Sequence, residues 1–133
     1  MLQLSKVLYE EMVAHCQREY PKEACGILAG NDHVVNDLYP MTNVDQSPIS
    51  YQMDPTEQLR IMKQMRVRTQ EMLAIYHSHP RGPAAPSAQD IARAFYPDAA
   101  HIIVSLASLE NPVVRGFRIV DGRATEIELH AIV

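Results

Sequence analysis

The sequence predicts a single α/β domain in which a mixed β-sheet is flanked by helices. Its 133 residues are enough for one domain, and they contain no internal repeat, low-complexity tract or shift in composition. Helical and strand patterns alternate along the first two thirds of the chain, and several strand patterns follow one another near its end. Such an order is typical of helices packed around one sheet. We therefore expect residues 1–133 to form one domain.

The first half of the chain begins with a helix pattern. Leu4, Leu8 and Met12 recur at helical spacing. Ser5 can cap the helix and a proline closes it, which predicts a helix from Ser5 to about Tyr20. An apolar run and a second segment, separated by an Asn-Asp turn, then predict two strands. The expected strands are Ala24–Ala29 and Val34–Met41.

A second helix is predicted to start at Asp54. This residue can cap free backbone amides, Pro55 suits the first helical position, and Glu57 can reach back to complete a capping box. An apolar stripe follows, made of Leu59, Met62, Met65 and Met72.

The rest of the chain contains four predicted strands, one loop and one helix. A strand over Met72–His77 delivers two histidines at its end, and a loop rich in proline and glycine follows. An Asp-Gly pair at 121–122 is a strong hairpin signal between the last two strands. The further expected elements are the loop Arg81–Pro86, the helix Ser87–Tyr96 and the strands His101–Ala107, Val113–Val120 and Ala124–Leu129.

Composition narrows the class of protein. The formal net charge of -4 provides no basic excess with which to neutralise phosphates, which argues against nucleic acid as a partner. No apolar stretch is long enough to span a membrane, and the first sixteen residues lack the apolar centre of a signal peptide. Only two cysteines, Cys16 and Cys25, are present, so we expect no disulfide framework and a reducing, cytoplasmic location.

The most informative segment is His77-Ser78-His79-Pro80, which Asp90 follows after a loop. Side chains two residues apart on a strand point to the same face, so His77 and His79 project together. Asp90, in the first turn of the next helix, can approach them from the side. Two imidazoles and a carboxylate suit Zn²⁺ and leave its fourth position open, as in catalytic zinc sites. The spacing therefore predicts a zinc hydrolase.

Hydrolysis also requires a base and a group that stabilises the oxyanion. The histidine motif contains no glutamate, and we predict Glu23, at the entry to the apolar strand 24–29, as the general acid/base. Ser87 has two candidate roles, because its hydroxyl can cap the helix that carries Asp90 or donate to the oxyanion of a tetrahedral intermediate. A cap uses the oxygen lone pair and not the proton, so both roles are compatible.

These five residues and their surroundings resemble the JAMM (MPN-plus) zinc metalloprotease family. The similar segments are His77 to Asp90, the run Glu23-Ala24-Cys25-Gly26-Ile27-Leu28-Ala29-Gly30 and Ile119-Val120-Asp121-Gly122 near the end of the chain. The chain most resembles small bacterial members that act on ubiquitin-like sulfur-carrier proteins, including peptidases that release cysteine from the carrier.

The resemblance implies a cytidine-deaminase-like α/β fold and a zinc ion bound by His77, His79 and Asp90. It also implies that Glu23 moves the proton and that Ser87 stabilises the oxyanion. The implied substrate is a ubiquitin-like sulfur carrier whose C-terminal Gly-Gly tail enters extended and is cleaved after its last glycine. Either cysteine or a protein lysine is released. The loop 81–86 leaves no room for the insertions with which eukaryotic deubiquitinases of this family grip ubiquitin.

Other readings stay open beside this one. The chain could be a non-enzymatic MPN scaffold, although such relatives usually lose the ligands, or a member of the RadC-like branch, which usually carries an additional N-terminal domain. A cytidine-type deaminase is disfavoured because the paired cysteines of its zinc site are missing. Cys25 could act as a nucleophile with His77 as its base, but a small buried side chain is the simpler interpretation.

The remaining ionisable residues are expected to be structural or solvated. Four histidines show no ligand spacing among themselves: His15, His33, His101 and His130. Four basic residues are expected on the second helix, and a solvated face is their default role. A weaker hypothesis makes this face a docking surface for an acidic carrier. The four residues are Arg60, Lys63, Arg66 and Arg68.

Overall fold

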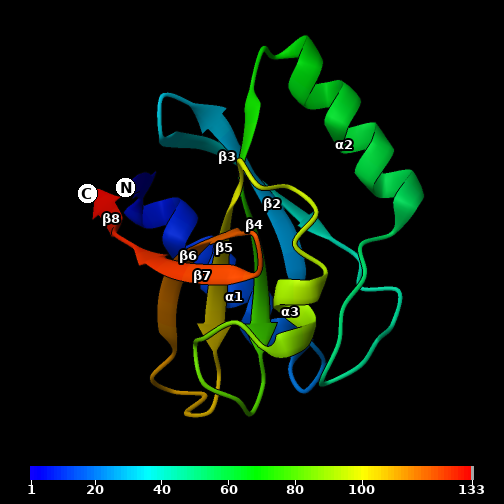
Figure 1. The fold of residues 1–133 in the computed structure, drawn as a ribbon, viewed down its shortest axis with the longest axis vertical. Coiled ribbons are helices and arrows are strands. Elements are labelled where there is room, and N and C mark those ends of the chain that lie inside the picture. Colours follow the sequence, from blue (N-terminus) through cyan, green and yellow to red (C-terminus); the bar gives the residue numbers. More distant parts are fainter. Residues whose placement is uncertain (133) are drawn as a thin grey trace.

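The computed structural model describes residues 1–132 and contains one mixed β-sheet. Its strands follow the order β7-β6-β5-β4-β2-β3-β1-β8 (Figure 1). At the centre, β4 pairs antiparallel with β2 and parallel with β5, so the expected mixed sheet is confirmed. The strands are β1 (Leu2–Ser5), β2 (Cys25–Asn31), β3 (Val34–Met41), β4 (Glu71–His79), β5 (Ala100–Ser105), β6 (Val113–Val120), β7 (Arg123–Ile127) and β8 (Leu129–Ile132).

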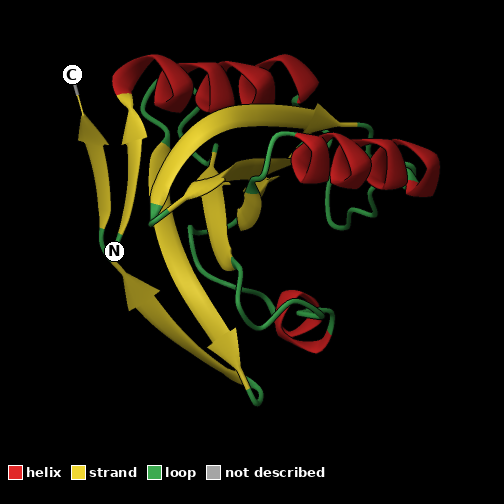
Figure 2. Ribbon diagram, turned by 90° about the horizontal axis from the view of Figure 1, so that it is seen from above, coloured by secondary structure: helices red, strands yellow, loops and turns green. Residues whose placement is uncertain are grey.

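The two long helices cover opposite faces of the central strands. Met12 and Cys16 of α1 pack in one apolar cluster with Tyr76 of β4. Ile61 and Met65 of α2 pack in another, against the other face. Figure 2 shows the sheet curving between these helices, with the short helix α3 set apart below. The helices are α1 (Lys6–Glu19), α2 (Pro55–Val67) and α3 (Ala88–Ala92). Within the described chain, none of them is long and apolar enough to cross a membrane.

Alternation along β4 directs its histidines toward the face that carries α2. Tyr76 belongs to the cluster under α1, whereas Ile75 belongs to the cluster under α2. Because successive side chains on a strand point to opposite faces, His77 and His79 share the face of Ile75. Ser78 points the other way, as the sequence predicts.

Ser78 fastens the start of β2 to the end of β4. Its backbone N–H donates to the carbonyl of Ala24 at 3.1 Å, and its hydroxyl accepts from the N–H of Ala24 at 2.8 Å. Both residues are almost fully buried. This double contact fixes the backbone beside Glu23 at the level of the two histidines.

The helix starts follow the sequence predictions with one exception. The hydroxyl of Ser5 accepts from the N–H of Leu8, and the carboxylate of Asp54 accepts from two amides of the first turn of α2. The predicted capping box at Asp54 is wrong, however. The carboxylate of Glu57 accepts from the N–H and hydroxyl of Thr42 at 2.7 and 2.8 Å instead, and the N–H of Asp54 donates to the carbonyl of Thr42 at 3.1 Å.

Other boundaries also differ from the predictions. Helix α3 ends at Ala92 and not at Tyr96. Pro97 disfavours helical geometry at Tyr96, but the helix already ends four residues before that position. The expected strand 124–129 is two strands, and its second part, β8, pairs in parallel with the unpredicted β1. These two strands are only four residues long, so the pairing itself defines them. Leu59 is exposed, and Ile61 occupies the inner face of α2 in its place.

We expect Ser78→Ala to lower the free energy of unfolding by about 1–3 kcal/mol, because the buried N–H of Ala24 loses its acceptor. Urea denaturation measures the change, with the exposed Ser108→Ala as control. A loss no larger than that of the control would show that the contact does not hold β2 to β4.

Candidate metal centre

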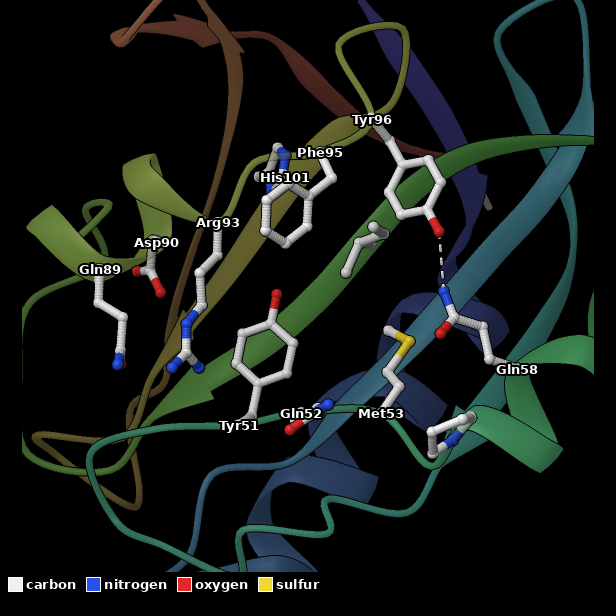
Figure 3. A pocket seen from close by; sticks show the side chains of 12 residues that line it. Tyr51, Gln52, Met53, Gln58, Gln89, Asp90, Arg93, Phe95, Tyr96 and His101 are labelled. Atoms are coloured by element: carbon white, nitrogen blue, oxygen red, sulfur yellow. Dashed lines mark hydrogen bonds between the residues drawn. The ribbon is translucent and has the colours of Figure 1, made fainter.

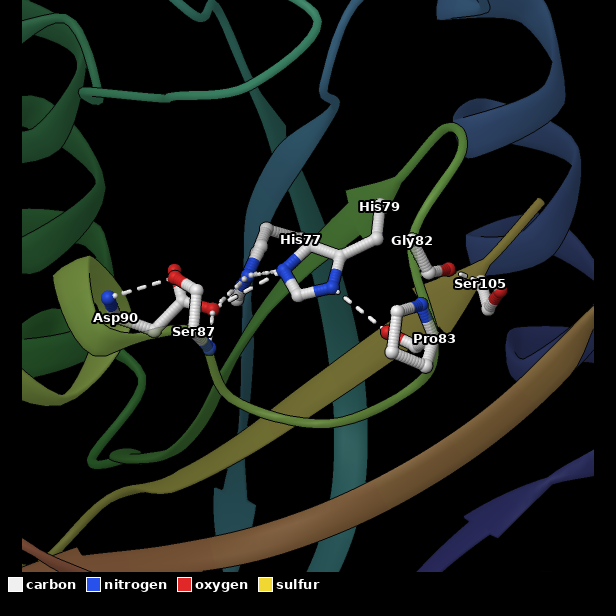
Figure 4. A network of polar contacts seen from close by, with 7 residues as sticks. All are labelled: His77, His79, Gly82, Pro83, Ser87, Asp90 and Ser105. Atoms are coloured by element: carbon white, nitrogen blue, oxygen red, sulfur yellow. Dashed lines mark hydrogen bonds and ion pairs between the residues drawn. The ribbon is translucent and has the colours of Figure 1, made fainter. Parts of the chain in front are cut away.

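Three ligand atoms converge at the end of β4. Nε2 of His77 lies 3.0 Å from Nε2 of His79, and Oδ2 of Asp90 lies 3.1 and 3.0 Å from these two nitrogens (Figure 4). A tetrahedral zinc ion with bonds of about 2.0–2.1 Å separates its ligand atoms by about 3.3–3.4 Å, so a small outward movement of the three atoms makes room for the ion. Within the described chain, the group of side chains placed to hold a metal ion consists of His77, His79 and Asp90.

The ring of His79 is oriented by the loop that follows it. Its Nδ1 donates to the carbonyl of Pro83 at 2.8 Å. A carbonyl only accepts, so the proton sits on Nδ1 and the neutral ring keeps a lone pair on Nε2, as a metal ligand requires. The loop is fixed in turn by the hydroxyl of Ser105, which donates to the carbonyl of Gly82 at 2.6 Å. Figure 4 shows this chain of contacts from β5 to His79.

Asp90 is aimed by a capping box at the start of α3. The hydroxyl of Ser87 accepts from the N–H of Asp90 at 3.1 Å, and Oδ2 of Asp90 accepts from the N–H of Ser87 at 2.9 Å. The same oxygen contacts both histidines. Burial alone would raise the pKa of Asp90, but the hydrogen bonds to His77 and His79 bring it well below its usual range. The cap predicted for Ser87 is confirmed, and its hydroxyl proton is still available to another acceptor.

His77 is fully buried and its ring is held by Tyr51. The two rings stack with centroids 4.6 Å apart and planes 24° apart. Burial lowers the pKa of His77 despite the raising effect of Asp90, which favours the neutral imidazole that a metal requires. Its Nδ1 is buried and has no hydrogen-bond partner among the described residues. Tyr51 was not predicted, because no sequence spacing links it to His77.

Glu23 lies beside this cluster. It is 5% exposed, and its Oε1 is buried with no hydrogen-bond partner among the described residues. Burial raises the pKa of its carboxyl from 4.5 to about 7; His79 opposes this rise and Asp90 adds to it. Its backbone carbonyl accepts from the buried side chain of Asn43, which also ties down the segment 43–52. The structure therefore brings all five predicted residues to one end of β4.

A cavity of about 430 Å³ adjoins Asp90 (Figure 3). Its walls include Tyr51, Arg93 and the aromatic rings of Phe95 and Tyr96, so it lies between the segment before α2 and the segment after α3. His101 also lines the cavity; it is 4% exposed, and its Nε2 has no partner in the described part of the chain. The sequence predicted an ordinary histidine there, since no ligand spacing marks position 101.

Cys25 does not have the environment of a nucleophile. Its thiol is fully buried, and burial raises its pKa to about 12. A reactive cysteine needs a lowered pKa and access to substrate. The interpretation of Cys25 as a small buried side chain is confirmed.

The remaining predicted ionisable residues have structural or solvated roles. His15 is buried and its Nδ1 contacts the hydroxyl of Tyr76 at 2.7 Å, whereas His33 and His130 are exposed. Arg68 lies just beyond α2, at its C-cap, and pairs with Asp37 at 3.2 Å. It therefore does not belong to the solvated face of the helix.

The chain belongs to the Prok-JAB family, described as prokaryotic homologs of the JAB domain, which matches residues 5–120. It is similar to the CysO-cysteine peptidase of Mycobacterium tuberculosis, with 39% identity over 94% of this chain and 87% of the relative. It is also similar to a probable TtuB-protein conjugate cleaving protease of Thermus thermophilus, with 43% identity over 71% of this chain and 64% of the relative.

A solved structure extends the similarity to three dimensions. The solution structure of a Desulfitobacterium hafniense protein matches with a TM-score of 0.89 and 42% identity, covering 98% of this chain and 92% of that one. The resemblance to the JAMM/MPN family that the sequence indicates is therefore confirmed, and so is the α/β fold.

In the metal-free protein, we expect Glu23→Gln to stabilise the fold more at pH 8 than at pH 5. The increase in the free energy of unfolding caused by the substitution should be larger at pH 8 by about 1–3 kcal/mol. The folded state keeps the proton of Glu23 up to a pH of about 7, whereas the unfolded chain loses it near 4.5. Wild-type stability therefore falls as pH rises through this window, and glutamine removes that loss. Urea denaturation in EDTA measures both proteins. Equal gains at pH 5 and pH 8 would contradict the raised pKa, and the exposed Glu19→Gln serves as control.

Proposed function

We propose that this protein is a zinc metallopeptidase that cleaves the bond after the C-terminal Gly-Gly of a ubiquitin-like sulfur-carrier protein. The observation that carries the proposal is the convergence of His77, His79 and Asp90 beside a buried carboxyl with a raised pKa. Zinc held by these three residues would polarise the scissile carbonyl and make the attacking water more acidic near neutral pH. The donor set, two neutral imidazoles and one carboxylate, fits that ion.

Glu23 is the proposed general acid/base. A pKa of about 7 lets its carboxyl exist in both protonation states at neutral pH. In the ionised state it takes the proton of the attacking water while the water oxygen bonds to the scissile carbon. It then gives this proton to the nitrogen of the leaving amine as the C–N bond breaks.

Ser87 is the proposed oxyanion donor. Its oxygen accepts from the N–H of Asp90, which leaves the hydroxyl proton free for the negative oxygen of the tetrahedral intermediate. The same cap holds Asp90 in place. In this proposal the oxygen of the Ser87 hydroxyl orients a metal ligand, and its proton contacts the substrate.

The proposed substrate class rests on the relatives. Their printed names describe a CysO-cysteine peptidase and a protease that cleaves TtuB-protein conjugates. The first name favours release of cysteine from the carrier, and the second favours release of a conjugated protein. We take cysteine release as the primary activity, because that relative matches 94% of this chain. The proposed compartment is the cytoplasm, since Cys16 and Cys25 are free buried thiols.

The test uses a ubiquitin-like carrier protein that ends in Gly-Gly-Cys and the zinc-loaded enzyme. We expect the wild type to release cysteine and Glu23→Gln to lose about 10²–10⁴-fold in kcat/KM with unchanged zinc content. Mass spectrometry measures cleavage, atomic absorption measures zinc, and Glu19→Gln is the matched control.

The outcomes separate the candidate functions. A fully active Glu23→Gln enzyme would overturn the assignment of the base. A wild type that binds no zinc and cleaves neither this substrate nor a carrier joined to a protein lysine would overturn the peptidase and favour the non-enzymatic scaffold.

A further inference from the structure

One face of α2 carries three cations and two exposed apolar side chains. At 100° per residue, these five positions fall within about 120° of the helix circumference. Ile61 and Met65, which are buried against the sheet, occupy the opposite side. We call this outer surface the basic face; it consists of Leu59, Arg60, Lys63, Arg66 and Val67.

The cations of the basic face are not neutralised by the protein itself. Among the described residues, none of Arg60, Lys63 and Arg66 forms an ion pair. Glu57, the acidic residue of α2, turns away from this face and binds Thr42. A uniformly positive face thus stands out on a chain whose formal net charge is -4.

The apolar members of the face are exposed to solvent. Leu59 is 56% exposed and Val67 is 85% exposed, and they lie two turns apart with the cations between and beside them. Exposed apolar side chains rimmed by charge are typical of protein-interaction surfaces. The charge identifies the complementary partner as acidic.

The cavity beside the metal centre reaches the first turn of α2, where Pro55 lies one helical turn before Leu59 of the basic face. Pro55 and Gln58, in the first turns of α2, line this cavity, and Asp90 lines its other end. Figure 3 shows Gln58 bonded to Tyr96 on one side of the cavity and Asp90 on the other. A protein seated on α2 can therefore extend a flexible tail past Pro55 and through the cavity to Asp90, one of the proposed metal ligands. A tail segment of four or five extended residues is about 13–17 Å long.

We propose that the basic face docks an acidic surface of the ubiquitin-like carrier while the carrier tail passes through the adjoining cavity. This inference rests on the proposed function. Three cations steer an acidic carrier toward the site from a distance, and the two apolar side chains bury against it on contact. Recognition of the folded carrier is thereby separated from hydrolysis of its tail.

The experiment compares two substrates of the zinc-loaded enzyme. One is the folded carrier ending in Gly-Gly-Cys, and the other is a synthetic peptide of its last eight residues with the same end. The test variant is R60E/K63E/R66E. The control variant, R18E/R115E/R123E, has the same net charge but changes exposed arginines on α1, β6 and β7, away from α2 (Figure 1).

We expect the test variant to raise KM for the carrier at least tenfold with little change in kcat, and to leave the peptide unaffected. Wild-type kcat/KM for the carrier should fall as salt rises from about 0.02 to 0.2 M, and that of the test variant should not. Peptide cleavage reports that the variant is folded. If glutamates on α2 prevent folding, R60Q/K63Q/R66Q gives the same comparison with a smaller effect.

If the wild type cleaves both substrates, three outcomes would overturn the docking proposal and leave the proposed function intact. They are an unchanged carrier KM in the test variant, an equal rise in the control variant, and a wild-type dimer that the test variant converts to a monomer in sedimentation. The last result would assign the basic face to a second copy of this chain. A wild type that cleaves neither substrate would instead overturn the proposed function.

Discussion

The site depends on one carboxylate oxygen held between two imidazole nitrogens. Oδ2 of Asp90 lies 3.1 and 3.0 Å from His77 and His79 and accepts a hydrogen bond from the backbone of Ser87. Each participant is fixed by a different element: the sheet holds His77, the loop carbonyl of Pro83 orients His79, and the cap of α3 aims Asp90. A displacement of any of these elements therefore separates the three ligand atoms.

The sheet connects this cluster to Glu23, the proposed general base. β2 and β4 pair side by side, and Ser78 bonds to the backbone next to Glu23, so the carboxyl is held where burial and Asp90 raise its pKa. The same burial favours neutral His77, which a metal requires. Burial thus raises the pKa of Glu23, the proposed base, and lowers the pKa of His77, a proposed ligand, because it favours the neutral form of each side chain.

The sequence could predict the parts of the site that obey a local rule. The period of a strand places His77 and His79 on one face, and capping preference places Asp90 in a first helical turn. Tyr51 and His101 could not be found this way, because they reach the site through contacts between distant segments. The strands β1 and β8, which lie side by side at one end of the sheet, could not be predicted for the same reason: four-residue strands are defined by their pairing. Helical periodicity alone also could not decide whether Leu59 or Ile61 faces the sheet.

The proposed function requires that the three atoms at the end of β4 bind zinc. Crystals of the zinc-loaded protein, measured with X-rays on either side of the zinc absorption edge, test it most directly. We predict one anomalous peak within about 2.0–2.2 Å of Nε2 of His77, Nε2 of His79 and Oδ2 of Asp90. Zinc-loaded crystals without a peak at these residues, or with zinc bound only elsewhere, would contradict it.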